Sequence, residues 1–295
     1  MRFTIFTPTY NRAYIIENLY RSLLRQTFRD FEWVVIDDGS TDNTKELFNS
    51  FLNDDNRFFE LKYKKVENGG KHRAINSGVK MAAGELFFIV DSDDYLSDNA
   101  LEIANNIENS IPNNTKNYYA GICGLRGYSS NNIIGTTFNG DFLDITSLER
   151  GKHNITGDKS EIFYTNVLKK YPFPEFDGEN FITECVVWDK IAYNGYKLRF
   201  FNKIIYICDY LTDGLTAQSD ELFNKTPKGY GLYLYQCGLF GKTFGVNKWL
   251  TYLKYYYQFR DRLSFKQIAN NLNIPPVIFK FRIIGMQIFY RLYDN

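Results

Sequence analysis

The sequence predicts an α/β protein with a mixed, mostly parallel central sheet and a helical extension at its C-terminal end. Strand and helix signals alternate over the first hundred residues, and several of these strands are short, nearly continuous apolar runs. Such alternation is typical of parallel sheets that helices cover on both faces. The length of 295 residues suits one large α/β domain with a helical appendage.

The first part of the chain contains four predicted strands, each followed by a helix. Apolar and β-rich runs predict strands at 3–7, 31–36, 58–65 and 86–90. Helical stripes and capping residues predict helices at 13–28, 41–52, 71–83 and 95–111.

The pattern is less regular beyond residue 115. Strands are expected at 118–128, 133–138 and 198–210, helices at 143–150 and 180–193, and helical structure from about residue 222 onward. No flexible linker interrupts the α/β part. We therefore predict one domain over 1–220, with halves 1–110 and 111–220, followed by a helical, basic and aromatic region over 221–295.

Charge and composition exclude several classes of function. The net charge of +1 argues against a binder of polyanions over the whole chain, but residues 238–295 carry +7 and the remainder −6. Two histidines are too few for a multi-histidine zinc site. The N-terminal apolar run is too short for a signal peptide, and no run approaches the roughly 18 residues of a spanning helix. The sequence therefore predicts a cytoplasmic protein.

Acidic residues follow two of the predicted strands. Asp37 and Asp38 come after the second strand, and Asp91, Asp93 and Asp94 come after the fourth. In an open α/β sheet, ligands bind beyond the carboxyl ends of the strands. Clustered carboxylates there would suit a hard cation such as Mg²⁺ or Mn²⁺. The alternative is that Asp93 and Asp94 only cap the helix that follows.

The two acidic strings belong to a longer set of short motifs that occur in a specific order along the chain. The order is Thr7-Pro8-Thr9-Tyr10-Asn11-Arg12, Gln26-Thr27, Asp37-Asp38-Gly39-Ser40, Asn68-x-Gly70 with Ala74-x-Asn76-x-Gly78, and Asp91-Ser92-Asp93-Asp94. Together they resemble the nucleotide-sugar-binding half of the family-2 glycosyltransferases, which have the GT-A fold. The resemblance is strong over residues 1–110 and moderate over 150–215.

The resemblance implies a nucleotide-sugar site in the first half. Its residues would be Thr7, Pro8, Thr9, Tyr10, Arg12, Asp38, Asn68, Lys71, Arg73, Asp91, Ser92 and Asp93. A carboxylate at Asp38 that accepts the N3–H of uracil would explain a preference for UDP, since cytosine has no proton there. Lys71 and Arg73 would reach the diphosphate or base, or would simply lie on a solvated helix face. They stand where many relatives have small residues, which leaves the diphosphate ligands open.

The resemblance also implies a metal site and a general base. Asp93, with help from Asp91, would hold Mn²⁺ or Mg²⁺. Glu184 stands where inverting members have the general base, and Cys185, Val186, Val187 and Trp188 would raise its pKa. The alternative is a carboxylate that caps a helix, and Glu179 is the second choice for the base.

Three further residues are predicted on the acceptor side. Asp158 and Lys159 belong to a Gly-Asp-Lys string that lies near the acceptor in relatives, where they would contact the acceptor or a phosphate. Trp188 would stack on a sugar or belong to the core. The implied reaction is inverting transfer from a UDP-sugar to a hydroxyl of a glycan or lipid-linked acceptor in cell-surface polysaccharide synthesis, at the inner face of the cell membrane. The rivals are a non-catalytic sugar- or nucleotide-binding module and a nucleotidyltransferase.

The tail allows two interpretations. Residues 264–275 resemble the first half of a helix-turn-helix, but no polar recognition helix follows, which argues against nucleic acid. Aromatic and aliphatic residues interleaved with Lys and Arg over 240–295 predict peripheral membrane contact. They are Trp249, Leu250, Leu253, Tyr256 and Tyr257, then Phe279, Phe281, Ile283, Ile284, Ile288 and Phe289. The alternative is packing on the catalytic domain or on a second subunit of a homo-oligomer.

Overall fold

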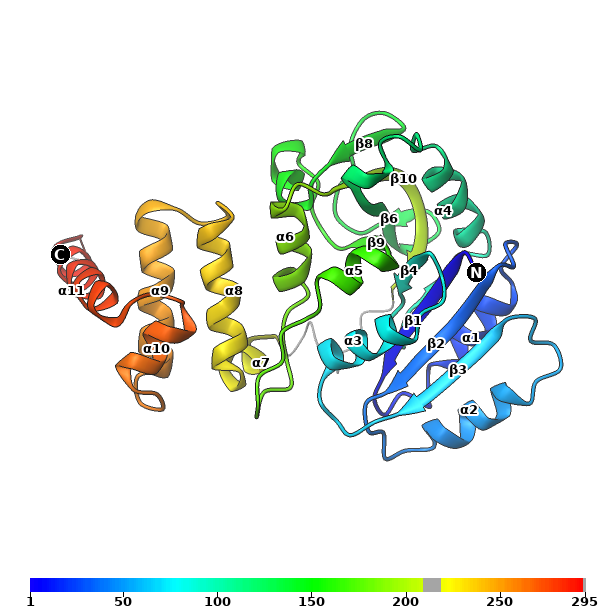
Figure 1. The fold of residues 1–295 in the computed structure, drawn as a ribbon, viewed down its shortest axis with the longest axis horizontal. Coiled ribbons are helices and arrows are strands. Elements are labelled where there is room, and N and C mark those ends of the chain that lie inside the picture. Colours follow the sequence, from blue (N-terminus) through cyan, green and yellow to red (C-terminus); the bar gives the residue numbers. More distant parts are fainter. Residues whose placement is uncertain (209–218, 294–295) are drawn as a thin grey trace. The chain divides into compact units, whose positions relative to one another are not determined.

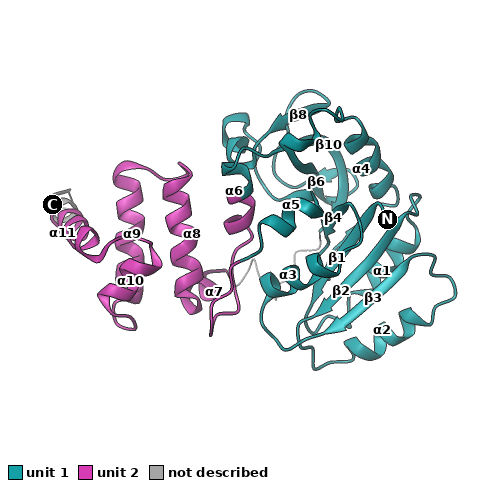
Figure 2. Ribbon diagram, in the orientation of Figure 1, with its two compact units in different colours: residues 1–173, 191–214 teal, residues 174–190, 215–295 magenta. Residues whose placement is uncertain are grey.

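The chain forms two compact units, shown in teal and magenta in Figure 2. The computed structural model describes residues 1–208 and 219–293, with the side chains up to residue 288. The first unit contains residues 1–173 and 191–214, and the second contains 174–190 and 215–295.

A ten-stranded mixed sheet forms the centre of the first unit (Figure 1). Its principal order is β3-β2-β1-β4-β9-β6-β10-β5, with β7 paired to β6 and β8 to β10. The strands are β1 (Phe3–Thr9), β2 (Phe31–Asp37), β3 (Glu60–Lys65), β4 (Leu86–Ile89), β5 (Tyr95–Leu96), β6 (Tyr119–Ser129), β7 (Asn132–Ile133), β8 (Phe142–Ile145), β9 (Lys159–Tyr164) and β10 (Lys197–Ile207). The four strands from β3 to β4 are parallel, and β9 runs antiparallel to both of its neighbours. The predicted fold class is confirmed.

Helices cover one face of the parallel strands, and Trp33 of β2 packs against them. The buried Trp33 ring packs near Tyr20 of α1 (Glu17–Leu24) and Phe48 of α2 (Thr44–Leu52). All seven residues of β2 are buried, which explains why its sequence is a nearly continuous apolar run rather than an alternating one.

The opposite face is covered by α3 (Lys71–Met81). Trp33 pairs in register with Ile5, so the adjacent Phe6 projects to the other side of the sheet. A Cβ at Gly78 of α3 would lie 2.1 Å from the Phe6 ring, so glycine is required for this close packing. The expectation of helices on both faces is therefore confirmed.

A buried carboxylate joins three parts of the first unit. Glu108 of α4 (Ala100–Asn109) has no exposed surface and accepts hydrogen bonds from Arg2, Tyr164 and, at 2.7 Å, Lys116. Burial alone would raise the pKa of Glu108, but these hydrogen bonds outweigh it and lower the pKa. The network connects the start of β1, α4 and the end of β9.

Several predicted elements differ from the structure. The helix expected at 143–150 is wrong, because β8 pairs there with β10 and a 3₁₀ helix follows at Ser147–His153. The helix expected at 95–111 begins only at Ala100, after the short strand β5. The sequence also failed to indicate β9 and the helix α5 (Thr165–Lys170). Part of the strand expected at 198–210 lies outside the described residues.

The described part of the second unit is helical. It contains α7 (Ser219–Lys225), α8 (Pro227–Leu239), α9 (Gly245–Phe259), α10 (Phe265–Asn271), α11 (Pro276–Tyr293) and, within 174–190, most of α6 (Cys185–Tyr193). Its core is built from Leu234, Tyr252, Leu253, Tyr255, Phe259, Ile268, Ala269, Leu272, Phe279 and Ile283. Across residues 1–208 and 219–293, no helix is long and apolar enough to cross a bilayer.

Candidate functional site

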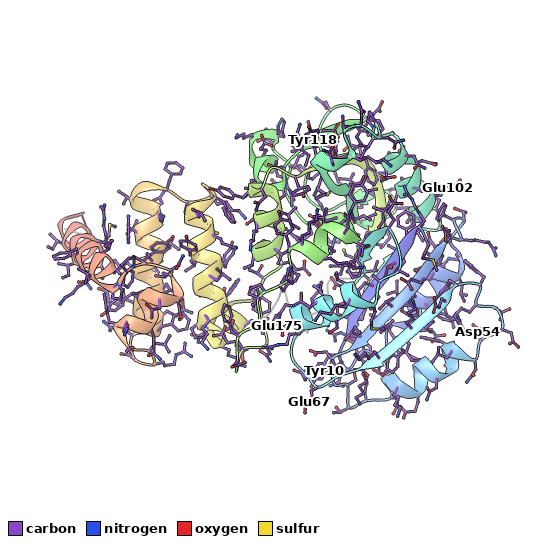
Figure 3. The ribbon with its side chains drawn as sticks, in the orientation of Figure 1. Tyr10, Asp54, Glu67, Glu102, Tyr118 and Glu175 are labelled. Atoms are coloured by element: carbon purple, nitrogen blue, oxygen red, sulfur yellow. The ribbon has the colours of Figure 1, made fainter. Side chains whose placement is uncertain are left out.

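The parallel register brings the predicted donor-side strings to one edge of the sheet. The strands β1, β2 and β3 end together at this edge, where Thr9 is in register with Asp37 and Asp37 with Lys65. Figure 3 labels Tyr10 and Glu67 at the same edge. The backbone N–H of Asp38 donates to the carbonyl of Thr9 at 2.8 Å, which joins the two loops directly.

The two adjacent aspartates after β2 have different surroundings. Asp37 is fully buried and accepts hydrogen bonds from Tyr63 and, at 2.7 Å, from the backbone N–H of Ser40. These contacts shape the turn after β2. Asp38 instead accepts the backbone N–H groups of Gly69 and Gly70, each at 2.8 Å and each on a different carboxylate oxygen.

Asp38 therefore holds the glycine loop that precedes α3. Asn68 closes the connection, because its side-chain amide donates to the Asp38 carbonyl at 2.8 Å. A Cβ at Gly39, whose φ is +87°, would lie 2.9 Å from the Asn68 nitrogen, so the turn after Asp38 requires glycine. Burial raises the pKa of Asp38, and the two glycine N–H groups offset this only in part.

The end of β1 carries buried hydroxyls, and the loop after it carries longer, more exposed side chains. Thr7 accepts a hydrogen bond from the Trp33 indole at 3.0 Å, which gives it a structural role. Thr9 is buried, and its Oγ1 has no hydrogen-bond partner within the described part of the protein. Tyr10 is half exposed, and Arg12 donates to the Tyr14 hydroxyl at 2.8 Å. Pro8 lies within the fully buried strand β1.

A polar network supports the turn from Asp91 to Asp94. The Asp91 backbone N–H donates to the Tyr206 hydroxyl at 2.9 Å, and that hydroxyl donates to the Asp94 carboxylate at 2.8 Å. The Arg126 guanidinium lies 4.2 Å from the centre of the Tyr206 ring. Tyr206 of β10 therefore holds the turn, and Arg126 of β6 packs on the Tyr206 ring. The sequence pattern did not indicate a role for either residue.

Lys71 forms an ion pair with Asp91. Its ammonium lies 2.5 Å from the Asp91 carboxylate, which brings the first turn of α3 to the end of β4. Burial would raise the pKa of Asp91, but Lys71 and Arg126 outweigh it and lower the pKa. Arg73 lies on the same turn of α3 and donates to the Gly69 carbonyl at 2.7 Å, so it supports the glycine loop.

The other two aspartates of the turn have raised pKa values. Burial and the nearby Asp91 charge raise the pKa of Asp93. The same two causes raise the pKa of Asp94 to about 7, against the hydrogen bond from Tyr206. Ser92, between Asp91 and Asp93, is buried. Asp94 is thus a buried part of the network, whereas Asp93 is only half buried.

Asp91 and Asp93 are suitable ligands for a hard divalent cation, since both supply only carboxylate oxygens. No group of three or more His, Cys, Asp or Glu with the arrangement of a metal site occurs among the described residues. Two carboxylates are enough for an ion that takes its remaining ligands from water and substrate phosphates. They are too few for a site that the protein completes by itself.

Glu184 and Trp188 belong to the second unit. Helix α6 begins at Cys185, and the Glu184 carbonyl accepts the backbone N–H of Trp188 at 3.0 Å. Glu184 is therefore the residue at which the helix starts, in agreement with the sequence-based position. Both side chains are half buried. The second candidate for the base, Glu179, accepts the N–H groups of Lys228 and Gly229 at 2.8 Å each and so caps α8.

The structure argues against a direct acceptor or phosphate contact by Lys159. Its side chain is buried, and its ammonium donates to the carbonyls of Ile134, Thr156 and Asp158 at 3.1, 2.6 and 3.3 Å. An ammonium has three protons, and all three are used here. Asp158 is exposed. Lys159 therefore stabilises the loops around it.

Comparison with known proteins agrees with this geometry. The model of the family "Glycosyl transferase family 2" matches residues 4–109, the segment that contains all the donor-side loops. Residues 4–109 belong to glycosyl transferase family 2. Glycosyltransferase GlyG of Streptococcus pneumoniae is 36% identical over 99 residues, which are 34% of this chain and 32% of GlyG.

A second relative aligns over a longer segment. The GalNAc(5)-diNAcBac-PP-undecaprenol beta-1,3-glucosyltransferase of Campylobacter jejuni is 28% identical over 194 residues, 63% of this chain and 58% of that protein. The matched segments thus span less than two thirds of the length of both relatives.

Solved structures show the same fold. Residues 1–349 of Staphylococcus aureus TarS, in complex with UDP-GlcNAc, superpose with a TM-score of 0.62 at 22% identity, covering 97% of this chain and 79% of that one. The chain therefore has the GT-A fold, as the sequence predicted.

Proposed function

We propose that this protein is an inverting glycosyltransferase that transfers a sugar from UDP to a hydroxyl of a glycan or lipid-linked acceptor during cell-surface polysaccharide synthesis. One observation carries the proposal: Asp38 with its glycine loop lies at the edge where β2 ends, and Lys71 connects that loop to the Asp91–Asp94 turn. These contacts support a nucleoside site at Asp38 beside charged groups suited to a diphosphate. The names of the relatives, an undecaprenol-linked glucosyltransferase among them, support the acceptor class.

Asp38 is the proposed uracil contact. Each of its oxygens accepts one glycine N–H and retains a second lone pair. One of these lone pairs would accept the N3–H of uracil. The Thr9 hydroxyl, which has no hydrogen-bond partner among the described residues, offers a further buried polar atom at the same edge.

Asp93 and Asp91 are the proposed holders of Mn²⁺ or Mg²⁺. When bound, the ion supplies a Lewis acid that stabilises charge on the leaving diphosphate. Lys71 neutralises Asp91, and its ammonium would lie near that group as a hydrogen-bond donor. Tyr206 holds the turn in place through its hydroxyl, and the Arg126 guanidinium lies over the Tyr206 ring.

Glu184 is the proposed general base. Its carboxylate takes the proton from the acceptor hydroxyl as the oxygen attacks the anomeric carbon, and the bond from that carbon to the diphosphate oxygen breaks. The result is inversion at the anomeric carbon. The support for this role is the position of Glu184 at the start of α6, together with the family resemblance.

The direct experiment is UDP release from a panel of UDP-sugars, with Mn²⁺ or with EDTA. We expect hydrolysis of one UDP-sugar only in the presence of metal, and its loss in Asp93→Ala. Asp98→Ala is the matched control, because Asp98 is an exposed carboxylate that pairs with Arg25 at 2.8 Å. If no UDP-sugar is hydrolysed and UDP binds no more tightly with metal, the proposed donor is wrong.

The base is tested once an acceptor is found. We expect Glu184→Gln to keep UDP affinity and to lower the transfer rate by about 10²- to 10⁴-fold. Glu175→Gln, in the same segment but exposed, should transfer at the wild-type rate. Equal transfer rates for the wild type and Glu184→Gln would show that another group takes the proton.

A further inference from the structure

Helix α11 has two apolar faces, and only one of them is used in the core of the second unit. Phe279 and Ile283 are buried against α9 and α10, beside which α11 lies in Figure 2. On the same helix, other large apolar side chains are 44% to 73% exposed. They are Val277, Ile278, Phe281, Ile284 and Ile288.

The exposed side chains form one continuous stripe. At about 100° per residue, Val277, Phe281, Ile284 and Ile288 lie within about 60° of one another. Phe279 and Ile283 lie on the opposite side of the helix. The stripe is therefore a second face of α11, distinct from the face that builds the core. The side chain of Phe289 lies outside the described residues.

Positive charge borders the stripe on both sides. By the same helical geometry, Lys280 lies about 40° beyond Ile284 at one edge of the stripe. Arg282 lies about 40° beyond the exposed Ile278 on the other side, and both basic residues are exposed. The Arg282 guanidinium lies over the Trp249 ring at 5.4 Å, which fixes its direction. An apolar stripe between two cations matches a helix that lies in a bilayer surface, with its long basic side chains reaching the headgroups.

Charge decides between a bilayer and a second copy of this chain. Over residues 245–293, eight Lys and Arg face the single acidic residue Asp261. Pairing of two α11 stripes would bring two such basic segments together, and like charges repel. An anionic lipid surface supplies the opposite charge, with a gain of about fivefold in affinity per basic residue near the surface.

We infer that the exposed stripe of α11 is a membrane-docking surface for anionic lipid, in which Phe281 and its neighbours enter the headgroup region and Lys280 and Arg282 contact lipid phosphates. This surface docks the protein on a bilayer without crossing it. The inference is independent of the proposed donor and acceptor, since it depends only on the residues of the second unit.

The test is sedimentation of the full-length protein with vesicles of phosphatidylcholine alone or mixed with phosphatidylglycerol. We expect binding to the mixed vesicles, weakened by salt. The double variant Phe281→Ser/Ile284→Ser should bind at least about tenfold more weakly. Lys280→Gln should lose about fivefold, and only on anionic vesicles. Both changes are at exposed positions, so the circular dichroism spectrum and thermal midpoint should stay as in the wild type.

The control is Tyr118→Ser, which removes a similarly exposed aromatic side chain from the first unit and should bind as the wild type does. Wild-type protein that does not sediment with anionic vesicles would overturn the inference. So would a double variant that binds as tightly as the wild type. A wild-type dimer in analytical ultracentrifugation that the double variant converts to a monomer would also overturn it, by assigning the stripe to a second copy.

Discussion

Replacement of Asp38 by Asn tests whether the glycine loop must be held in its observed conformation for UDP to bind. In the structure each Asp38 oxygen accepts one glycine N–H at 2.8 Å. Asparagine keeps one acceptor oxygen and presents an NH₂ group to the other N–H, so one charge-assisted hydrogen bond is lost. Such a bond contributes about 1.5–3 kcal/mol. If the loop must hold this conformation to bind the nucleotide, UDP affinity should fall about 10- to 150-fold.

Isothermal titration calorimetry of UDP with wild type and Asp38→Asn measures this loss. The matched control is Asp98→Asn, where an exposed carboxylate pairs only with Arg25 among the described residues. The control should keep UDP affinity within about twofold, as surface ion pairs contribute little. UDP affinity in Asp38→Asn within twofold of wild type would refute the reasoning, because the loop would then be held by other contacts.

Three further predictions concern stability. Glu108→Gln should lower the free energy of unfolding at pH 7 by about 3 kcal/mol in urea titrations. The pKa of Glu108 in the folded protein lies below its ordinary 4.5, so the ionised carboxylate stabilises the fold above that pH. The difference in unfolding free energy between wild type and variant should therefore shrink as the pH falls through the folded pKa. Gly78→Ala should destabilise by about 1–3 kcal/mol in the same assay, since its Cβ would overlap the Phe6 ring. Glu179→Gln should lower the calorimetric melting temperature of the α8 region, because one of two N–H groups at that helix start loses its acceptor, at a cost of about 1–2 kcal/mol.

The parallel half of the sheet was predictable because its signals are local. The strand β2 is apolar at almost every position and ends in acidic residues, and this pattern alone indicates a strand buried on both faces. The position of Asp38, the glycine loop and the Asp91–Asp94 turn at one sheet edge follows from parallel strand order. What the sequence left open was which aspartate supports the fold. Asp37 does so through Ser40 and Tyr63, a distinction set by tertiary contacts.

The antiparallel half depends on contacts that a sequence pattern does not contain. Strand β8 carries Asp144, which pairs with Arg199 of β10 at 2.7 Å and accepts from Tyr119 at 2.9 Å. These cross-strand partners override the local helical pattern. Strand β9 begins with the buried Lys159, whereas a lysine in a sequence is expected at the surface. Likewise, no pattern indicated that residues 174–190 would group with the C-terminal helices, although Glu179 connects them to α8.

The aspartates after β4 show how the fold changes an argument made from charge. As a sequence, Asp91–Asp94 is an acidic cluster that calls for an external cation. In the fold, Lys71 already neutralises Asp91, and Arg126 lowers its pKa further. Asp93 is therefore the carboxylate of this turn that still needs a positive partner. Its burial and the nearby charge of Asp91 raise the pKa of Asp93. Asp93 beside the neutralised Asp91 attracts a divalent cation less strongly than a cluster of unpaired carboxylates would. The diphosphate of a donor would add the missing negative charge, so we expect metal and nucleotide to bind here together rather than in sequence.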